Sequence, residues 1–203
     1  MINFGLVVIG AHTGEFLLDD IKKFSHKSCL LIEPVQYNFD KLKLNTSTFH
    51  RVMYCNKAIS DVHETNKFYY VKEESVRKLG KHWATGIGSF KKKHILDHRY
   101  KRFKIEDSDI EARDVEFITF DDLIKKYSIK SIDKLQIDVE GSEYKIMKSI
   151  DFNKVKIDKV FFECKHFDDT FTEGEKLEEI KNILSSNGYT LKRVDKENMI
   201  AEK

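Results

Sequence analysis

The sequence has few cysteines, almost no excess of either charge and no long apolar run. Its three cysteines, Cys29, Cys55 and Cys164, are far apart and odd in number. They therefore indicate free thiols in a reducing cytoplasm, with neither a disulfide framework nor a cysteine metal site. Lysine and arginine total 36 against 34 for aspartate and glutamate, so the net charge of +2 gives no indication of a nucleic-acid or membrane partner. No stretch reaches the length of a membrane span, and the first apolar run lacks the basic flank of a signal peptide. We expect a cytoplasmic protein.

Residues 6–34 form the most informative stretch, which has the pattern of a cofactor-binding βαβ unit. An apolar strand over residues 6–9 ends in a small-residue turn over residues 10–14, and a helix over residues 15–24 leads to a second apolar strand. In open α/β sheets, cofactors bind where backbone N–H groups and a helix N-terminus follow the carboxyl end of a strand. Glu33, at the end of the second strand, is placed to accept hydrogen bonds from both ribose hydroxyls of an adenosine.

The turn itself distinguishes between two adenosine cofactors. The fingerprint of NAD-binding enzymes is G-x-G-x-x-G, whereas this turn has Gly10 and Gly14 with Ala11 in place of the second glycine. Ala11 argues against the close approach of a pyrophosphate. S-adenosyl-L-methionine (SAM) has no phosphate and suits the spacing better. An NAD-binding oxidoreductase and an ordinary strand, turn and helix without a ligand are the alternatives for this stretch.

Acidic residues are expected at the same edge of the sheet. Asp138 and Glu140 stand at the carboxyl end of a strand predicted over residues 132–139, and Glu163 ends another predicted over residues 159–163. In a doubly wound sheet these ends face the crevice that also holds Gly10 and Glu33. The three carboxylates are therefore candidate catalytic residues. The alternative for Asp138 and Glu140 is that they only cap the following helix.

Residues 73–111 have the least regular pattern in the chain. They include the only tryptophan, Trp83, and a basic run over residues 91–104. Irregular segments of this length inside a compact domain are usually lids or binding loops. We expect a single domain over residues 1–203, in which this insertion closes over the acceptor. A solvated charged surface is the alternative for the basic run.

Short motifs along most of the chain occur in a characteristic order. They are Ile9-Gly10-Ala11-His12-Thr13-Gly14-Glu15, Ile32-Glu33-Pro34, Ala58-Ile59-Ser60-Asp61, Phe120-Asp121-Asp122-Leu123 and Ile137-Asp138-Val139-Glu140-Gly141-Ser142-Glu143. The set resembles the FkbM family of SAM-dependent methyltransferases, and the Ile-Asp-Val-Glu-Gly run is its most specific part. The resemblance implies a class I methyltransferase fold, which is a Rossmann-like three-layer α/β sandwich around a seven-stranded, mostly parallel sheet with an antiparallel last strand. It also implies methyl transfer, usually to a hydroxyl oxygen.

Three residues depart from the family pattern. The family generally has Asp where Val8 stands, Asn where His12 stands and Lys where Gln136 stands. Loss of the acid at position 8 removes one polar anchor near the cofactor turn, which keeps a non-catalytic binding domain on a methyltransferase scaffold among the alternatives.

The sequence thus predicts a SAM-dependent O-methyltransferase acting on a sugar, a glycan or a small metabolite. A nucleic-acid methyltransferase is a weaker alternative, supported only by the basic run. Asp138 is the first candidate for the base, followed by Glu140 and Glu163. No metal site is predicted. The methionine part of SAM is assigned to the turn, the ribose to the end of the second strand and the adenine to the end of the third, so the predicted cofactor residues are Gly10, Ala11, His12, Gly14, Glu15, Glu33, Pro34, Ala58 and Ile59.

Overall fold

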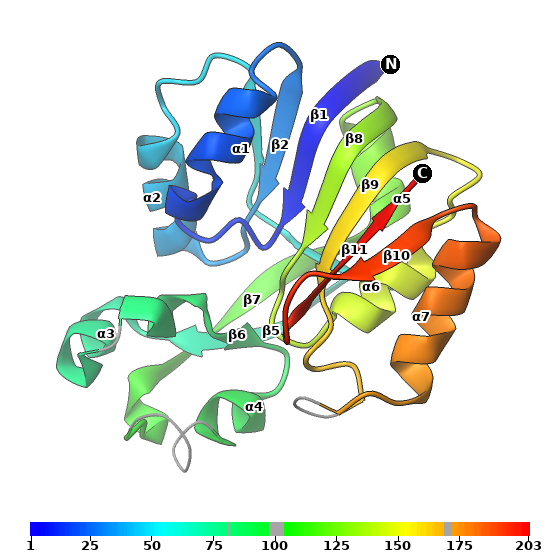
Figure 1. Ribbon diagram of the computed structural model, residues 1–203. Helices are drawn as coiled ribbons and strands as arrows, with labels where there is room; N and C mark the ends of the chain where they lie inside the picture. The colour runs from blue at the N-terminus through cyan, green and yellow to red at the C-terminus, as the bar shows by residue number, and fades with distance from the viewer. Residues whose placement is uncertain (81, 98–103, 169–171) are drawn as a thin grey trace.

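A seven-stranded sheet of order β10-β11-β9-β8-β1-β2-β3 forms the centre of the computed structural model, which describes residues 1–80, 82–97, 104–168 and 172–203 (Figure 1). The last strand of the chain, β11, is antiparallel to β9 and forms a hairpin with β10. The neighbours β3, β2, β1, β8 and β9 are all parallel. The predicted mostly parallel sheet with an antiparallel last strand is confirmed. The strands are β1 (Ile2–Ile9), β2 (Ser28–Ile32), β3 (Val52–Cys55), β8 (Ile129–Ile137), β9 (Lys156–Glu163), β10 (Thr190–Arg193) and β11 (Asn198–Glu202).

Helices cover both faces of this sheet, which explains why β1 is apolar at consecutive positions. Leu6 and Val8 point into a cluster with α1 (Leu18–Lys23) and α2 (Gln36–Asn45). Val7 and Ile9 point into the larger cluster on the opposite face. That cluster contains buried side chains of α5 (Phe120–Lys126), α6 (Glu143–Ser149) and α7 (Glu175–Ser186). The three-layer sandwich is therefore present. None of the described helices is long and apolar enough to cross a membrane.

A second sheet lies at the carboxyl ends of the parallel strands (Figure 1). It has the order β4-β7-β5-β6, in which β5 is antiparallel to both β7 and β6. The aromatic and β-branched run over residues 67–71 is part of β5. The strands are β4 (Ala58–Ser60), β5 (Glu64–Val71), β6 (Gly88–Ser89) and β7 (Ile110–Thr119).

The segment over residues 73–111 contains more regular structure than its sequence pattern indicates. It includes α3 (Glu73–Leu79), a 3₁₀ helix (His82–Gly86), strand β6 and α4 (Lys92–Asp97). Helices of 7 and 6 residues are too short to produce a recognisable apolar period. Ala84, Ile87, Ile95 and Ile105 form a small apolar core for this segment together with the end of β5.

The three cysteines are buried free thiols, as predicted. Cys29 lies in β2, Cys55 ends β3 and Cys164 directly follows β9. Each is surrounded by the apolar side chains of the two main clusters. Their role is therefore packing.

Candidate active site

A cavity of about 630 Å³ opens where the carboxyl ends of β1, β2 and β8 meet the second sheet. Its volume is within the usual range for small-molecule sites. Gly14 and Glu163 are the two predicted site residues that do not line it. The predicted residues that do are Gly10, Ala11, His12, Glu15, Glu33, Pro34, Ala58, Ile59, Asp138 and Glu140.

The turn after β1 is fixed between its two neighbouring strands. The N–H groups of Gly10 and Ala11 donate to the carbonyl of Ile32 at 3.0 and 2.8 Å, and the N–H of Asp138 donates to the carbonyl of Ile9 at 3.0 Å. Gly10 has a φ of +88°, and a Cβ there would lie 1.7 Å from the carbonyl oxygen of Asp138. Only glycine allows this approach of β1 to β8.

Gly14 has a different role, because it packs against α2. A Cβ at this position would lie 2.5 Å from a methyl group of Leu42. With its φ of +76°, Gly14 starts the 3₁₀ turn Glu15–Leu17 that leads into α1. Gly14 therefore helps to position α1 against α2, and it does not line the cavity.

Glu33 is oriented by the backbone on both sides of it. One carboxylate oxygen accepts the N–H of His12 at 3.0 Å, and the other accepts the N–H of Val35 at 2.8 Å. The residue is 5% exposed, and burial raises its pKa to about 7 in spite of these two hydrogen bonds. A carboxylate has about four lone-pair sites, so each oxygen can accept a further hydrogen bond from a ligand in the cavity.

The loop after β8 presents Asp138 and Glu140 to the cavity. Glu143, at the start of α6, accepts the N–H groups of Val139 at 2.8 Å and Gly141 at 2.9 Å. Glu143 is therefore the residue that organises this loop, a role that the sequence did not assign. Burial, together with the charge of Glu140, raises the pKa of Asp138 to about 6.

Glu140 lies in a group of charged side chains around the end of β9. It has a φ of +57°, and one of its oxygens lies 3.3 Å from Nε2 of His166 and 3.7 Å from Nζ of Lys165. Burial would raise the pKa of Glu140, but the hydrogen bond with His166 and the charge of Lys165 outweigh it and lower the pKa to about 2. Lys165 also forms a buried ion pair with Glu163, which no local sequence pattern indicates.

Glu163 is separated from the cavity by this group. Burial and the charges of Asp138 and Glu140 raise its pKa to about 9. Of the three predicted catalytic carboxylates, the structure brings Asp138 and Glu140 to the cavity, and it places Glu163 behind them.

The three departures from the family pattern occupy two places. Val8 and Gln136 are paired positions on the neighbouring strands β1 and β8. An acid and a base at these positions would be neighbours, so their joint replacement leaves no unpaired buried charge. His12 has a φ of +50° and lies in the cofactor turn, where its Nε2 is 2.5 Å from Oγ1 of Thr85. This contact joins the turn to the segment over residues 73–111.

Comparisons with known proteins identify the family. The model of the methyltransferase FkbM domain matches residues 9–191. Among solved structures, precorrin-6y C5,15-methyltransferase from Geobacter metallireducens GS-15 is similar with a TM-score of 0.48 and 10% identity, over 100% of this chain and 82% of that one. Fibrillarin from Aeropyrum pernix, in complex with natively bound SAM, has a TM-score of 0.44 and 9% identity, over 98% of this chain and 65% of that one. No curated protein matches the sequence. The match over residues 9–191 shows that the chain belongs to the FkbM family of methyltransferase domains, whose cofactor is SAM.

Proposed function

We propose that the protein transfers the methyl group of SAM to a hydroxyl oxygen of a sugar, a glycan or a small metabolite. The observation that carries this proposal is the position of Asp138. Asp138 lines the cavity, and its backbone carbonyl lies against Gly10 in the turn that the family resemblance assigns to the cofactor. A base at this place can remove the proton of an acceptor hydroxyl while the oxygen attacks the methyl carbon.

The cofactor is proposed to lie along the ends of β1, β2 and β4. The methionine part would contact the turn from Gly10 to Glu15, where backbone groups and the start of a helix are exposed to the cavity. Glu33 would bind the ribose hydroxyls with the lone pairs that the backbone leaves available. Ala58 and Ile59 would cover one face of the adenine, because they provide an apolar wall beside Pro34.

The chemical step is an in-line displacement at a methyl carbon. The acceptor oxygen forms a bond to this carbon as the bond from carbon to the sulfonium breaks, and the hydroxyl proton passes to Asp138. The products are a methyl ether, S-adenosylhomocysteine and a proton that Asp138 releases to water. Alignment of the two reactants supplies most of the rate enhancement, and the base contributes roughly 10²–10⁴-fold.

The segment over residues 73–111 is proposed to cover the acceptor within this single domain. Thr85, Gly86 and Phe90 line the cavity, and Thr85 contacts His12 of the cofactor turn. Thr85 also contacts the core through its carbonyl, which accepts a hydrogen bond from the side chain of Asn38 at 2.8 Å. Closure of this segment would exclude water from the reacting atoms.

The basic run favours a small acceptor over a nucleic acid. Lys92 and Lys93 form ion pairs with Asp107 and Asp97 at 2.5 and 2.7 Å, so part of the positive charge of the run is neutralised within the protein. Lys91 and Lys104 of the run are exposed, and residues 98–103 lie outside the described residues.

The test is a calorimetric titration with SAM followed by methyl-transfer assays over a panel of sugars, glycans and small hydroxylated metabolites. Asp138→Asn should leave the Kd for SAM unchanged and lower turnover by at least about 10²-fold. Asp133→Asn is the matched control, because Asp133 lies on β8, the strand that directly precedes Asp138, and pairs with Lys27 away from the cavity. Full turnover in Asp138→Asn would refute the assignment. Saturable binding of a nicotinamide cofactor, or SAM binding without transfer to any acceptor, would favour the alternatives.

A further inference from the structure

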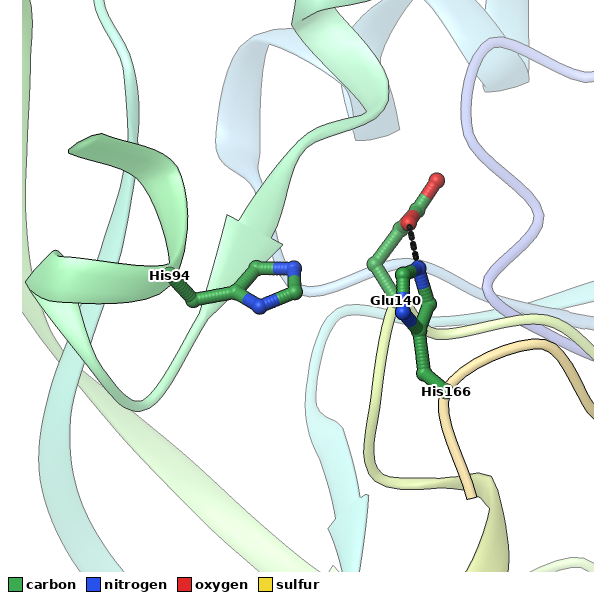
Figure 2. Close-up of side chains that lie close together, drawn as sticks. All are labelled: His94, Glu140 and His166. Atoms are coloured by element: carbon green, nitrogen blue, oxygen red, sulfur yellow. Dashed lines mark ion pairs between the residues drawn. The ribbon is translucent and has the colours of Figure 1, made fainter. Parts of the chain in front are cut away.

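Two histidines and a glutamate from three separate parts of the chain meet at the edge of the cavity. His94 comes from α4, Glu140 from the loop after β8 and His166 from the residues after β9. Figure 2 shows the ring of His94 facing the pair formed by Glu140 and His166. One potential ligand atom from each residue lies within 4.8 Å of those of the other two. A single ion can therefore contact all three after small side-chain movements.

We propose that His94, Glu140 and His166 bind a divalent first-row transition-metal ion. Two imidazoles and one carboxylate are the ligand set that zinc, cobalt, nickel, iron or manganese accepts, whereas magnesium and calcium prefer sites made of oxygen atoms. Three protein ligands leave at least one coordination position open, as in catalytic metal sites.

The surroundings of the three side chains suit a cation. The side chains of His166 and Glu140 are 9% and 23% exposed, so an ion between them would be shielded from bulk water. Lys165 lies 3.7 Å from Glu140, but its Nζ also contacts Glu163 and lies 3.3 Å from Glu197. Glu140 is therefore one of three carboxyl groups around this single lysine.

A neighbouring acidic group is a weaker candidate. Potential ligand atoms of Asp138, Glu143 and Glu163 also lie within 4.8 Å of one another. However, Glu143 accepts backbone N–H groups with both of its oxygens, and Glu163 is paired with Lys165. A metal ion there would have to break these interactions.

The position of the site suggests two consequences. Because His94 is on α4 and the other two ligands are on core loops, the ion would fasten the segment over residues 73–111 to the methyltransferase core. Because Glu140 also lines the cavity, an open coordination position could bind the acceptor hydroxyl and lower its pKa, which assists removal of its proton. This second role rests on the proposed function, whereas metal binding itself does not.

The experiment titrates the protein, freed of metal by a chelator, with Co²⁺ alone and without SAM. We expect calorimetry to show that one equivalent of Co²⁺ binds, and we expect the complex to have visible d–d absorption. Addition of Zn²⁺ should abolish this absorption, whereas equimolar Mg²⁺ should not. His94→Ala and the conservative Glu140→Gln should each weaken Co²⁺ binding by more than about 100-fold, since loss of a ligand should exceed the roughly 10–100-fold effect of outer-shell changes. Thermal unfolding of the metal-free variants confirms that they fold.

His63→Ala is the matched control. His63 also lies beside two carboxylates, at 3.1 Å from Asp122 and 3.6 Å from Glu116, but its side chain is 57% exposed. The His63→Ala variant should bind Co²⁺ with the same stoichiometry and affinity as the wild type. Absence of stoichiometric Co²⁺ binding, or equal binding by folded His94→Ala and wild type, would overturn the proposal.

SAM binding is measured in parallel on the same metal-free protein. Co²⁺ binding without SAM binding would support the metal site and refute the proposed function. SAM binding without Co²⁺ binding would refute the metal site and leave the proposed function in place.

Discussion

Restoring the family's acid and base at positions 8 and 136 tests whether the two departures compensate for each other. The three variants are Val8→Asp, Gln136→Lys and the double substitution. Val8 is fully buried in the cluster of β1, α1 and α2, with Leu31 of β2 on one side and Gln136 of β8 on the other. A carboxylate at position 8 therefore meets apolar side chains and one neutral amide. An uncompensated buried charge of this kind costs about 3–5 kcal/mol.

The second substitution should recover part of this loss. Gln136 is partly exposed and lines the cavity, so Gln136→Lys alone should change the free energy of unfolding by less than about 1 kcal/mol. Lys134, two residues earlier on the same face of β8, already forms an ion pair with Asp20 of α1 at 2.6 Å. A lysine can therefore be accommodated on this face. In the double variant the new charges occupy paired positions, and we expect a coupling energy of about 2 kcal/mol, within the usual range for residues in contact.

Urea denaturation of the wild type and the three variants gives the complete cycle. At pH 7, Val8→Asp should lower the free energy of unfolding by about 3–5 kcal/mol. This loss corresponds to a Tm lower by about 6–20 °C, since 1 kcal/mol corresponds to about 2–4 °C in a domain of this size. The loss should shrink at lower pH, because burial raises the pKa of the new carboxyl in the folded state and its protonated form carries no charge. Strict additivity of the two single substitutions would refute the view that positions 8 and 136 act as a pair.

Two further predictions concern the cofactor site. Gly10→Ala should lower the free energy of unfolding by about 1–3 kcal/mol more than Gly188→Ala does, and only Gly10→Ala should abolish SAM binding. The two glycines have similar φ values, +88° and +83°, but only a Cβ at position 10 would collide with the carbonyl of Asp138. Equal urea midpoints for the two variants would contradict this reasoning. Because burial raises the pKa of Glu33 to about 7, its carboxylate is mostly protonated at pH 6, and calorimetry should give a Kd for SAM about tenfold weaker at pH 6 than at pH 8. Glu33→Gln should remove this pH dependence, and an unchanged profile would show that another group titrates.

The local pattern of the sequence was sufficient for the elements of the main sheet and for the family. The consecutive apolar residues of β1 indicate a strand that is buried on both faces, because side chains on either face then contact other apolar side chains. Thr119, three residues before Asp122, is a typical helix N-cap residue, and its side chain accepts the N–H of Asp122 at the start of α5. Such signals are local because the hydrogen bonds that they describe join residues a few positions apart.

Tertiary structure alone decided which of the predicted residues meet. Gly14 and Glu163 carry the same local signals as Gly10 and Asp138, but helix packing and the ion pair with Lys165 place them behind the cavity wall. The sequence did not single out His94, because a lone histidine has no local pattern that distinguishes a ligand from a surface residue. His94 meets Glu140 and His166 because distant strands pair and because residues 73–111 fold onto the core. Contacts between residues so far apart in the chain produce no periodic pattern in the sequence.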